Sequence, residues 1–333
     1  MGISMVEVAA KAGVSVATVS RIMNGKTGFS EETRLKVEGV IAELGYQKNE
    51  LASSLKRNNS QTIGVIIPSM TTNYHGLIVD GIETKAREAG YSVLLSHSGN
   101  DGEFLAQSLQ TLGERRVQGI LLVSIQPSQD ELALLNKLRI PYLFISASSP
   151  KLSYPYVKID DYQGAFEVTT YLISQGHQQI AFVGANLNDQ VAGKPRLLGY
   201  QAALKAQGFV SQPELVLSGD FGLEKAKQGM LDLLRKKLPV TAVFAASDEA
   251  GIGVIKACLS QGLQVPRDIS VCGFDDSQTA LLSTPELTTL HQPLEEMGEK
   301  SVTKLIAVCE GQGSLTSEIF PHRLIERQSV KTL

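Results

Sequence analysis

Apolar residues in the first sixty positions recur with the spacing of short α-helices. Ser4 and Glu7 form a capping-box pattern at the start of a first helix, and Gly13 follows it as a turn residue. Ser15 can cap a second helix over residues 16–24. One face of this helix is apolar, and the other is small, polar and basic, with Val16, Ala17, Ser20, Arg21 and Asn24. Two short helices joined at a glycine predict a helix-turn-helix, whose second helix enters the major groove of DNA.

A third helix is expected after Ser30, which can cap it. Glu31 and Glu32 fall in its first turn, where the helix dipole favours acidic side chains, and Gly45 ends it. The apolar side of this helix is expected to comprise Leu35, Val37, Val40, Ile41 and Leu44. The alternative is a small three-helix bundle without a function of its own.

Beyond residue 60, short apolar runs alternate with helical stretches. In the first such stretch, Ile78, Ile82 and Ala86 recur at a spacing of four. The apolar runs are 63–67, 91–95, 119–123, 142–145, 180–183, 242–245 and 269–272. This alternation predicts parallel sheets covered by helices on both faces. Two such sheets in series predict two α/β subdomains, with a ligand cleft outside the carboxyl ends of their strands.

Charge distinguishes the two ends of the chain. The whole sequence has a formal net charge of −3, which alone argues against a nucleic-acid partner. The first sixty residues, however, carry eight lysine and arginine residues against six acidic ones, so the more basic segment coincides with the predicted helix-turn-helix.

Composition narrows the class of protein. Hydrophobic residues make up 43% of the chain and charged residues 20%, as in an ordinary globular protein. Three cysteines, odd in number and far apart, argue against a disulfide framework or a zinc cluster and favour a reducing cytoplasm. No apolar run reaches the roughly 18 residues of a membrane span, and no signal-peptide pattern is recognised. We therefore expect a cytoplasmic protein with no membrane partner.

Motifs for catalysis are missing from the sequence. It contains no nucleophile elbow, phosphate-binding loop or paired zinc-ligand spacing, so no enzyme activity, cofactor or metal is expected. Asp275 and Asp276 could indicate metal or acid–base chemistry, but they lack a third ligand or a basic partner. His177 precedes a predicted strand and is expected to be structural. His75 lies at the exit of the first core strand, and both a role in lining the cleft and a structural role are open for it.

The segments AAKAGVSVATVSRIMNG and SEETRLKVEGVIAELGYQKNELASSLKR resemble the DNA-binding headpiece of the lactose-repressor/galactose-repressor (LacI/GalR) family. The resemblance implies a sequence-specific transcriptional regulator, expected to be a repressor, that is controlled by a small-molecule effector. It implies DNA contacts by Ser15, Val16, Ala17, Thr18, Ser20, Arg21 and Asn24. Val16 and Ala17 offer only apolar contact, for instance to thymine methyl groups, whereas Arg21 can bond a guanine edge.

Residues 49–56 resemble the family's hinge helix, in which Asn49 and Leu55 would contact DNA and Leu55 would enter the minor groove as a wedge. The family usually has proline before this asparagine and arginine after the alanine, where this chain has Lys48 and Ser53. The hinge would then be less pre-organised or would grip phosphate differently. The alternative is a polar linker.

The resemblance also implies a core similar to periplasmic sugar-binding proteins, with two Rossmann-like subdomains and chain crossings near Asp160, Gln292 and Pro321. The expected domains are a headpiece at 1–57, a linker at 58–61 and a core at 62–333 for effector binding and dimerisation. The N-subdomain would hold about 62–159 and 292–320, and the C-subdomain about 160–291 and 321–333.

Six positions of the core correspond to the family's effector site. Arg196 and Asp275 match its effector-binding arginine and aspartate, and their side chains could pair with ligand hydroxyls. Ser247 lies where the family commonly has asparagine, and Ser146 where some members have aspartate. Tyr74 and His75 lie where two aromatic residues often close the pocket. The alternative is that Arg196 and Asp275 are surface or interdomain ion-pair residues.

A carbohydrate is the first expectation for the effector. A sugar acid or phosphate is also open, because Lys194 lies near Arg196 in the sequence, and a nucleoside could stack on Tyr74. A homodimer would hold two headpieces over a near-palindromic operator, and effector binding would change their spacing. The alternative is a solute-binding protein, or a small-molecule sensor that does not bind an operator. An enzyme is disfavoured because no nucleophile–base pair is recognised.

Overall fold

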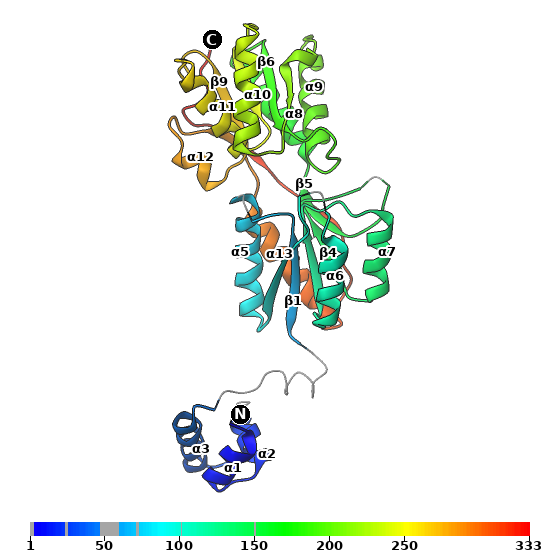
Figure 1. Ribbon diagram of the computed structural model, residues 1–333, viewed down its shortest axis with the longest axis vertical. Helices are drawn as coiled ribbons and strands as arrows, with labels where there is room; N and C mark the ends of the chain where they lie inside the picture. The colour runs from blue at the N-terminus through cyan, green and yellow to red at the C-terminus, as the bar shows by residue number, and fades with distance from the viewer. Residues whose placement is uncertain (1–2, 24–25, 47–59, 71–72, 101, 150) are drawn as a thin grey trace. The chain divides into compact units, whose positions relative to one another are not determined.

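A computed structural model describes residues 3–23, 26–46, 60–70, 73–100, 102–149 and 151–333. The chain forms two compact units, Met1–Ser60 and Gln61–Leu333 (Figure 1). None of the helices in the described ranges is long and apolar enough to cross a bilayer. In the same ranges, no three histidine, cysteine or acidic residues gather as metal ligands would.

The first unit is a three-helix structure whose ends are set by local capping. It contains α1 (Met5–Ala12), α2 (Val16–Met23) and α3 (Glu31–Leu44). The capping box forms as predicted, because the Ser4 hydroxyl accepts from the backbone N–H of Glu7 and the Glu7 carboxylate accepts from that of Ser4. Ser15 and Ser30 accept from the N–H groups of Thr18 and Thr33 at 3.1 and 3.2 Å.

The expectation for one residue of α3 is wrong. Leu35 is 58% exposed, whereas Val37 is fully buried against Val8 and Val19 in the core of this unit. Two residues turn an α-helix by about 200°, so Leu35 and Val37 must point to nearly opposite sides. Only one of them can face the small core, and the other is left in solvent.

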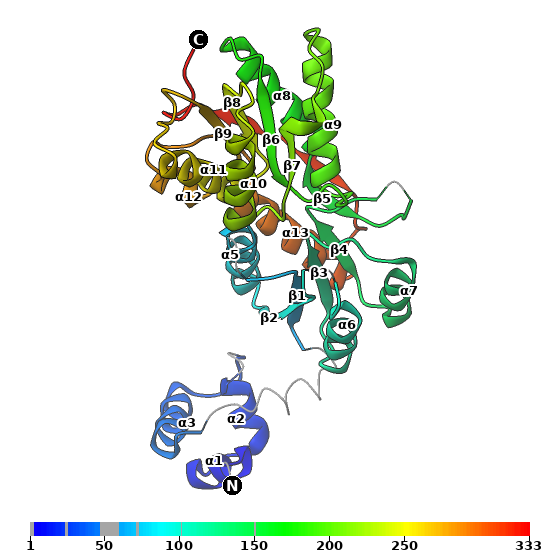
Figure 2. The same cartoon turned by 45° about the horizontal axis from the view of Figure 1, so that its top comes forward.

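The second unit contains two six-stranded sheets (Figures 1 and 2). The first sheet has the order β11-β5-β4-β3-β1-β2, with all pairs parallel. Its strands are β1 (Thr62–Ile67), β2 (Ser92–His97), β3 (Gly119–Val123), β4 (Tyr142–Ile145), β5 (Tyr156–Ile159) and β11 (Glu318–Phe320). Its helices are α5 (Asn73–Glu88), α6 (Leu105–Glu114), α7 (Gln129–Leu138) and α13 (Leu294–Cys309). We call this sheet with its helices the first subdomain.

The second sheet has the order β12-β10-β9-β8-β6-β7, and only β12 is antiparallel to its neighbour. Its strands are β6 (Ile180–Ala185), β7 (Val216–Ser218), β8 (Ala242–Ala245), β9 (Ser270–Asp275), β10 (Thr288–His291) and β12 (Arg323–Ile325). Its helices are α8 (Asp161–Ser174), α9 (Gly193–Ala206), α10 (Leu223–Arg235), α11 (Asp248–Ser260) and α12 (Gln278–Leu282), with a 3₁₀ turn at Pro213–Leu215. These elements form the second subdomain.

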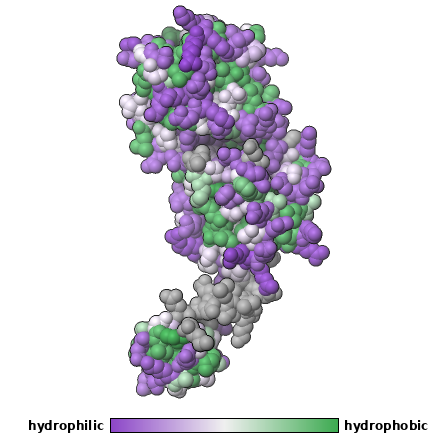
Figure 3. All heavy atoms as spheres, viewed as in Figure 1, coloured by the Kyte–Doolittle hydropathy of each residue, from purple (hydrophilic) through white to green (hydrophobic). Residues whose placement is uncertain are grey.

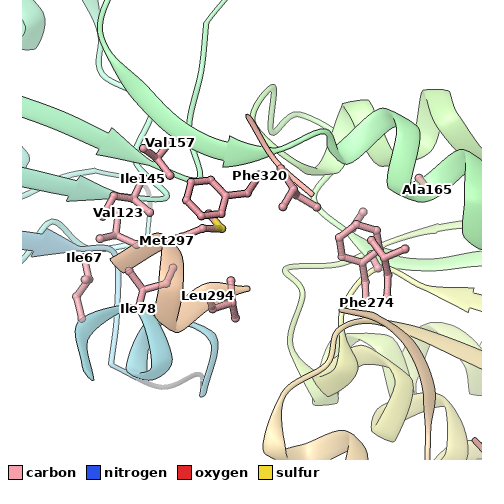
Figure 4. Packing of buried hydrophobic residues seen from close by; sticks show 14 of the residues in the cluster. Ile67, Ile78, Val123, Ile145, Val157, Ala165, Phe274, Leu294, Met297 and Phe320 are labelled. Carbon is pink, nitrogen blue, oxygen red and sulfur yellow. The ribbon is translucent and has the colours of Figure 1, made fainter. Parts of the chain in front are cut away.

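Each sheet is covered on both faces, as the apolar runs predict. Helices α5 and α13 pack on one face of the first sheet and α6 and α7 on the other. In the second subdomain, α8 and α9 cover one face and α10 and α11 the other. A buried cluster contains residues of both subdomains, including Met297 and Phe320 in the first and Phe274 in the second (Figure 4). The predicted architecture, a helix-turn-helix unit followed by two α/β subdomains, is therefore confirmed.

Two glycines allow α5 and α13 to approach closely. A Cβ atom at Gly298 would lie 2.2 Å from the carbonyl oxygen of Ile78, and one at Gly81 would lie 2.1 Å from that of Glu295. Because both obstacles are backbone atoms, no side-chain adjustment could relieve the clash. Outside this buried seam, polar and apolar side chains are interspersed on the visible face of the core (Figure 3).

Candidate functional site

The expected DNA-contact residues of α2 lie on its solvent side. Ser15, Val16, Ala17 and Arg21 are exposed, and Thr18 and Ser20 are half-buried. Val19 and Ile22, on the opposite side, pack into the core of the unit. The other three expected contacts, Asn24, Asn49 and Leu55, and the hinge at 49–56, lie outside the described residues.

In the core, several candidate effector residues lie at the carboxyl ends of parallel strands. Ser146 follows β4, Ser247 follows β8, and Asp275 ends β9. Ser146 has φ of 54° and Asp275 has φ of 120°, conformations that residues other than glycine rarely adopt. Such strain is concentrated at ligand and active sites, where the surrounding structure maintains it.

Arg196 projects from α9 and is only 4% exposed. Its Nε and Nη2 atoms lie 3.0 and 2.9 Å from Oδ1 of Asp161, and its Nη1 donates to the carbonyl oxygen of Ala246 at 2.5 Å. The guanidinium carbon lies 3.7 Å from the centre of the Phe274 ring, within the range of a cation–π interaction. Arg196 is therefore a buried, fully packed charge, not a surface residue.

Asp275 lies on the other side of Arg196. Its Oδ1 atom is 3.8 Å from Nη1 of Arg196 and accepts a hydrogen bond from the Gln292 side chain at 2.7 Å. Burial raises the pKa of the Asp275 carboxyl well above its usual range, and the positive charge of Arg196 partly opposes this shift. Their burial excludes the alternative that both residues lie on the surface, and the ion pair that they form lies within the second subdomain.

Tyr74, near the start of α5, reaches this group from the first subdomain. Burial raises the pKa of its phenol, Asp275 and Asp161 raise it further, and Ser146 and Arg196 lower it, so the phenol lies within electrostatic reach of all four side chains. The Ser146 hydroxyl is buried and makes no hydrogen bond of regular geometry. The structure thus brings together four of the six expected effector residues: Tyr74, Ser146, Arg196 and Asp275.

His75 and Ser247 make contacts of a different kind. The His75 ring packs edge-on against Tyr74, with ring centres 5.4 Å apart, and burial lowers its pKa to about 4, so it is neutral at pH 7. Ser247 caps α11: its hydroxyl accepts from the N–H of Ala250 at 3.0 Å and donates to the carbonyl of Phe221 at 2.6 Å. The donor of the Ser247 hydroxyl and one of its acceptor sites are therefore used in hydrogen bonds within the protein.

His177 has the structural role expected of it. Its ring is buried, with Nδ1 3.1 Å from the Thr241 hydroxyl and Nε2 3.1 Å from the carbonyl of Lys331. These contacts fasten the C-terminal segment to the loop before β6.

Two further charged residues, Lys158 and Asp161, join this buried cluster without having been predicted from the sequence. Lys158 in β5 is 8% exposed, and its Nζ lies 3.0 Å from Oδ2 of Asp161, the carboxylate that also pairs with Arg196. The signal for Lys158 was present, since it is the one charged residue of an otherwise apolar strand, Tyr156–Ile159. Asp161 gave no such signal, because it follows Asp160, whose own side chain caps α8.

A third buried carboxylate, Asp248, fastens neighbouring loops of the second subdomain. It accepts from the N–H and hydroxyl of Ser277 at 2.7 and 2.9 Å and from the hydroxyl of Thr289 at 2.5 Å. Burial raises the pKa of Asp248 to about 7, and these hydrogen bonds oppose the shift. All three donors belong to the second subdomain, so these hydrogen bonds of Asp248 do not connect the two subdomains.

Comparison with known proteins agrees with this geometry. Residues 4–49 match the bacterial regulatory proteins of the lacI family, and residues 169–330 match the periplasmic binding protein-like domain. The chain is 32% identical over 330 residues to the HTH-type transcriptional regulator RegA of Clostridium saccharobutylicum, covering 99% of each protein. It is 35% identical to the ribose operon repressor of Escherichia coli K12, covering 91% of this chain and 92% of the repressor.

A solved structure extends the similarity to the whole fold. The lac repressor dimer bound to operator and the anti-inducer ONPF superposes with a TM-score of 0.89 at 30% identity, covering 99% of this chain and all of that one. The helix-turn-helix unit, the two sheets and the full-length similarity lead to one conclusion. This chain belongs to the lacI family of bacterial regulatory proteins and is a DNA-binding transcriptional regulator.

Proposed function

We propose that this protein is an effector-controlled repressor that acts as a homodimer on a near-palindromic operator in the cytoplasm. The headpiece (1–57) and its hinge bind DNA, and the core (62–333) binds a carbohydrate or a sugar derivative between its two subdomains. Val16, Ala17 and Arg21 read bases, because they form the exposed side of α2.

One observation carries the effector part of the proposal. Tyr74 belongs to the first subdomain, and its phenol lies within electrostatic reach of Arg196, Asp161 and Asp275, which pair with one another in the second subdomain. A molecule that binds among them must part or replace these contacts. Its binding energy therefore differs between two arrangements of the subdomains, which is the requirement for an allosteric effector.

The test begins with an operator. The full-length chain is used to select binding sites from a pool of random DNA duplexes, and affinity for the selected site is measured by fluorescence anisotropy. A two-fold symmetric site should emerge, and a scrambled duplex should bind far more weakly. If no site is enriched, the protein is a solute-binding protein or a sensor without operator binding, and the proposed function is wrong.

The effector is tested on the same operator complex. A ligand that binds the core should change operator affinity by roughly 5- to 150-fold, the usual range of an allosteric coupling. Asp275→Asn should abolish that response and leave ligand-free operator binding within a few-fold of wild type. If the variant responds as wild type does, Asp275 is not part of the effector site.

A further inference from the structure

Lys158 is a buried cation whose hydrogen-bonding capacity is incompletely used. A lysine ammonium has three N–H donors. Only the contact with Asp161, at 3.0 Å, has the length of a strong hydrogen bond. The other two contacts are long, 3.4 Å to the carbonyl oxygen of Val191 and 3.5 Å to the hydroxyl of Ser148.

The two cations of the cluster are unevenly paired with its two carboxylates. Lys158 and Arg196 lie within 3.0 Å of the same carboxylate, Asp161. The second carboxylate, Asp275, stands 3.8 Å from Arg196 and is held by Gln292. Two cations therefore share one close counter-ion, although a buried charge is costly unless it is paired.

A second observation concerns a buried hydroxyl group just after the strand next to that of Lys158. The Ser146 hydroxyl is buried beside Tyr74, and its interaction with that phenol falls short of a regular hydrogen bond, which is uncommon for a buried polar group. Ser146 follows β4, and Lys158 lies in β5, the strand that pairs with it. Under-used donors therefore come from adjacent strands of one sheet.

Lys194, the lysine that the sequence places near Arg196, is not part of this cluster. Its side chain is exposed at the start of α9, whereas that of Arg196, two positions later, is buried. The second cation of the site is thus Lys158, which lies far from Arg196 in the sequence but shares Asp161 with it.

We propose that Lys158 and Arg196 form an anion-binding subsite and that the effector is a polyhydroxylated molecule with a carboxylate or phosphate group. The anionic oxygens take the under-used donors of Lys158, and Asp275, Ser146 and Tyr74 bind the hydroxyl groups. A neutral sugar would leave the two cations with their single close counter-ion. This inference rests on the proposed function, since it names the ligand of the proposed effector site.

The experiment uses the full-length chain and a matched ligand panel. For each common aldopentose and aldohexose, the neutral sugar, its aldonic and uronic acids and its terminal phosphate are screened by thermal shift, and binders are titrated by calorimetry. We expect binding only in the acid or the phosphate arm, and the arm that binds identifies the anionic group. The affinity should fall as salt is raised, because ion pairing is screened.

Matched variants test the residue assignment. Lys158→Met should weaken the charged ligand by about 10- to 150-fold, the typical value of a charged hydrogen bond. Lys158→Arg should keep the preference for the charged member, and Lys194→Met should bind as wild type. Urea unfolding of each variant checks that the core is folded. The preference of the wild-type chain for charged over neutral ligands is measured without any substitution, so it does not depend on whether a variant folds.

The outcomes separate this inference from the proposed function. The inference is overturned if a neutral sugar binds as tightly as its charged counterparts, if no charged member binds, or if folded Lys158→Met binds with unchanged affinity. If a neutral sugar changes operator affinity, the inference fails but the proposed function stands. If a charged ligand binds in a Lys158-dependent way and leaves operator affinity unchanged, the inference stands but the proposed allosteric control fails.

Discussion

Replacing Arg196 by alanine should destabilise the core as well as remove an effector contact. The substitution deletes the bonds to Asp161 and Ala246 and the contact with the Phe274 ring. Removing one partner of a buried ion pair typically costs about 3–5 kcal/mol, because the other charge is left uncompensated. Lys158 still pairs with Asp161, so we expect a loss near the lower end of that range.

The measurement is urea unfolding followed by far-ultraviolet circular dichroism, because the chain has no tryptophan for fluorescence. Lys194→Ala, an exposed lysine on the same helix, is the matched control and should change the free energy of unfolding by less than about 0.5 kcal/mol. A double-mutant cycle with Asp161→Asn should give a coupling energy of about 1–3 kcal/mol between the two residues.

A stable Arg196→Ala variant would contradict a stabilising role of this charge cluster. A loss below about 1 kcal/mol, with no coupling to Asp161, would mean that the buried pair contributes no net stability. If such a variant also lost its response to effector, Arg196 would be a ligand-binding residue without a structural role.

Three further predictions concern the other parts of the chain. Arg21→Ala should cost about 1–3 kcal/mol on the selected operator and much less on random DNA, measured by anisotropy; equal losses on both would assign Arg21 to phosphate. Val37→Ala should lower the protection of headpiece amides from hydrogen exchange by about 2 kcal/mol, whereas Leu35→Ala should change it by less than about 0.5 kcal/mol; similar losses would contradict the assigned faces of α3. Because the pKa of Asp248 is raised, the folded chain retains a proton between about pH 4 and 7 that the unfolded chain has released. The free energy of unfolding should therefore fall as pH rises through this window, by at most about 1.4 kcal/mol per pH unit. Asp248→Asn should remove that part of the slope in urea titrations at pH 4, 5.5 and 7, and an unchanged slope would mean that Asp248 does not titrate there.

The sequence by itself determined the features that depend on neighbours a few residues apart. The capping box of Ser4 and Glu7 and the caps at Ser15 and Ser30 join residues three positions apart, so they can be read directly. The alternation of apolar runs and helical stretches likewise predicted two helix-covered sheets, because each strand is buried on both faces. The similarity to a family then predicted Tyr74, Ser146, Arg196 and Asp275, which the fold gathers in one place.

Only the tertiary structure decided which charges lie together in the buried cluster. Lys158 and Lys194 are both lysines near the expected cleft, and no local rule separates them. Lys158 is buried because Asp161, Ser148 and Val191, which come from three different segments, close around its ammonium group. Lys194 has no such enclosure and faces solvent. Asp161 is only three positions away, but Ser148 and Val191 are brought from distant segments, and a one-dimensional pattern does not contain those distant partners.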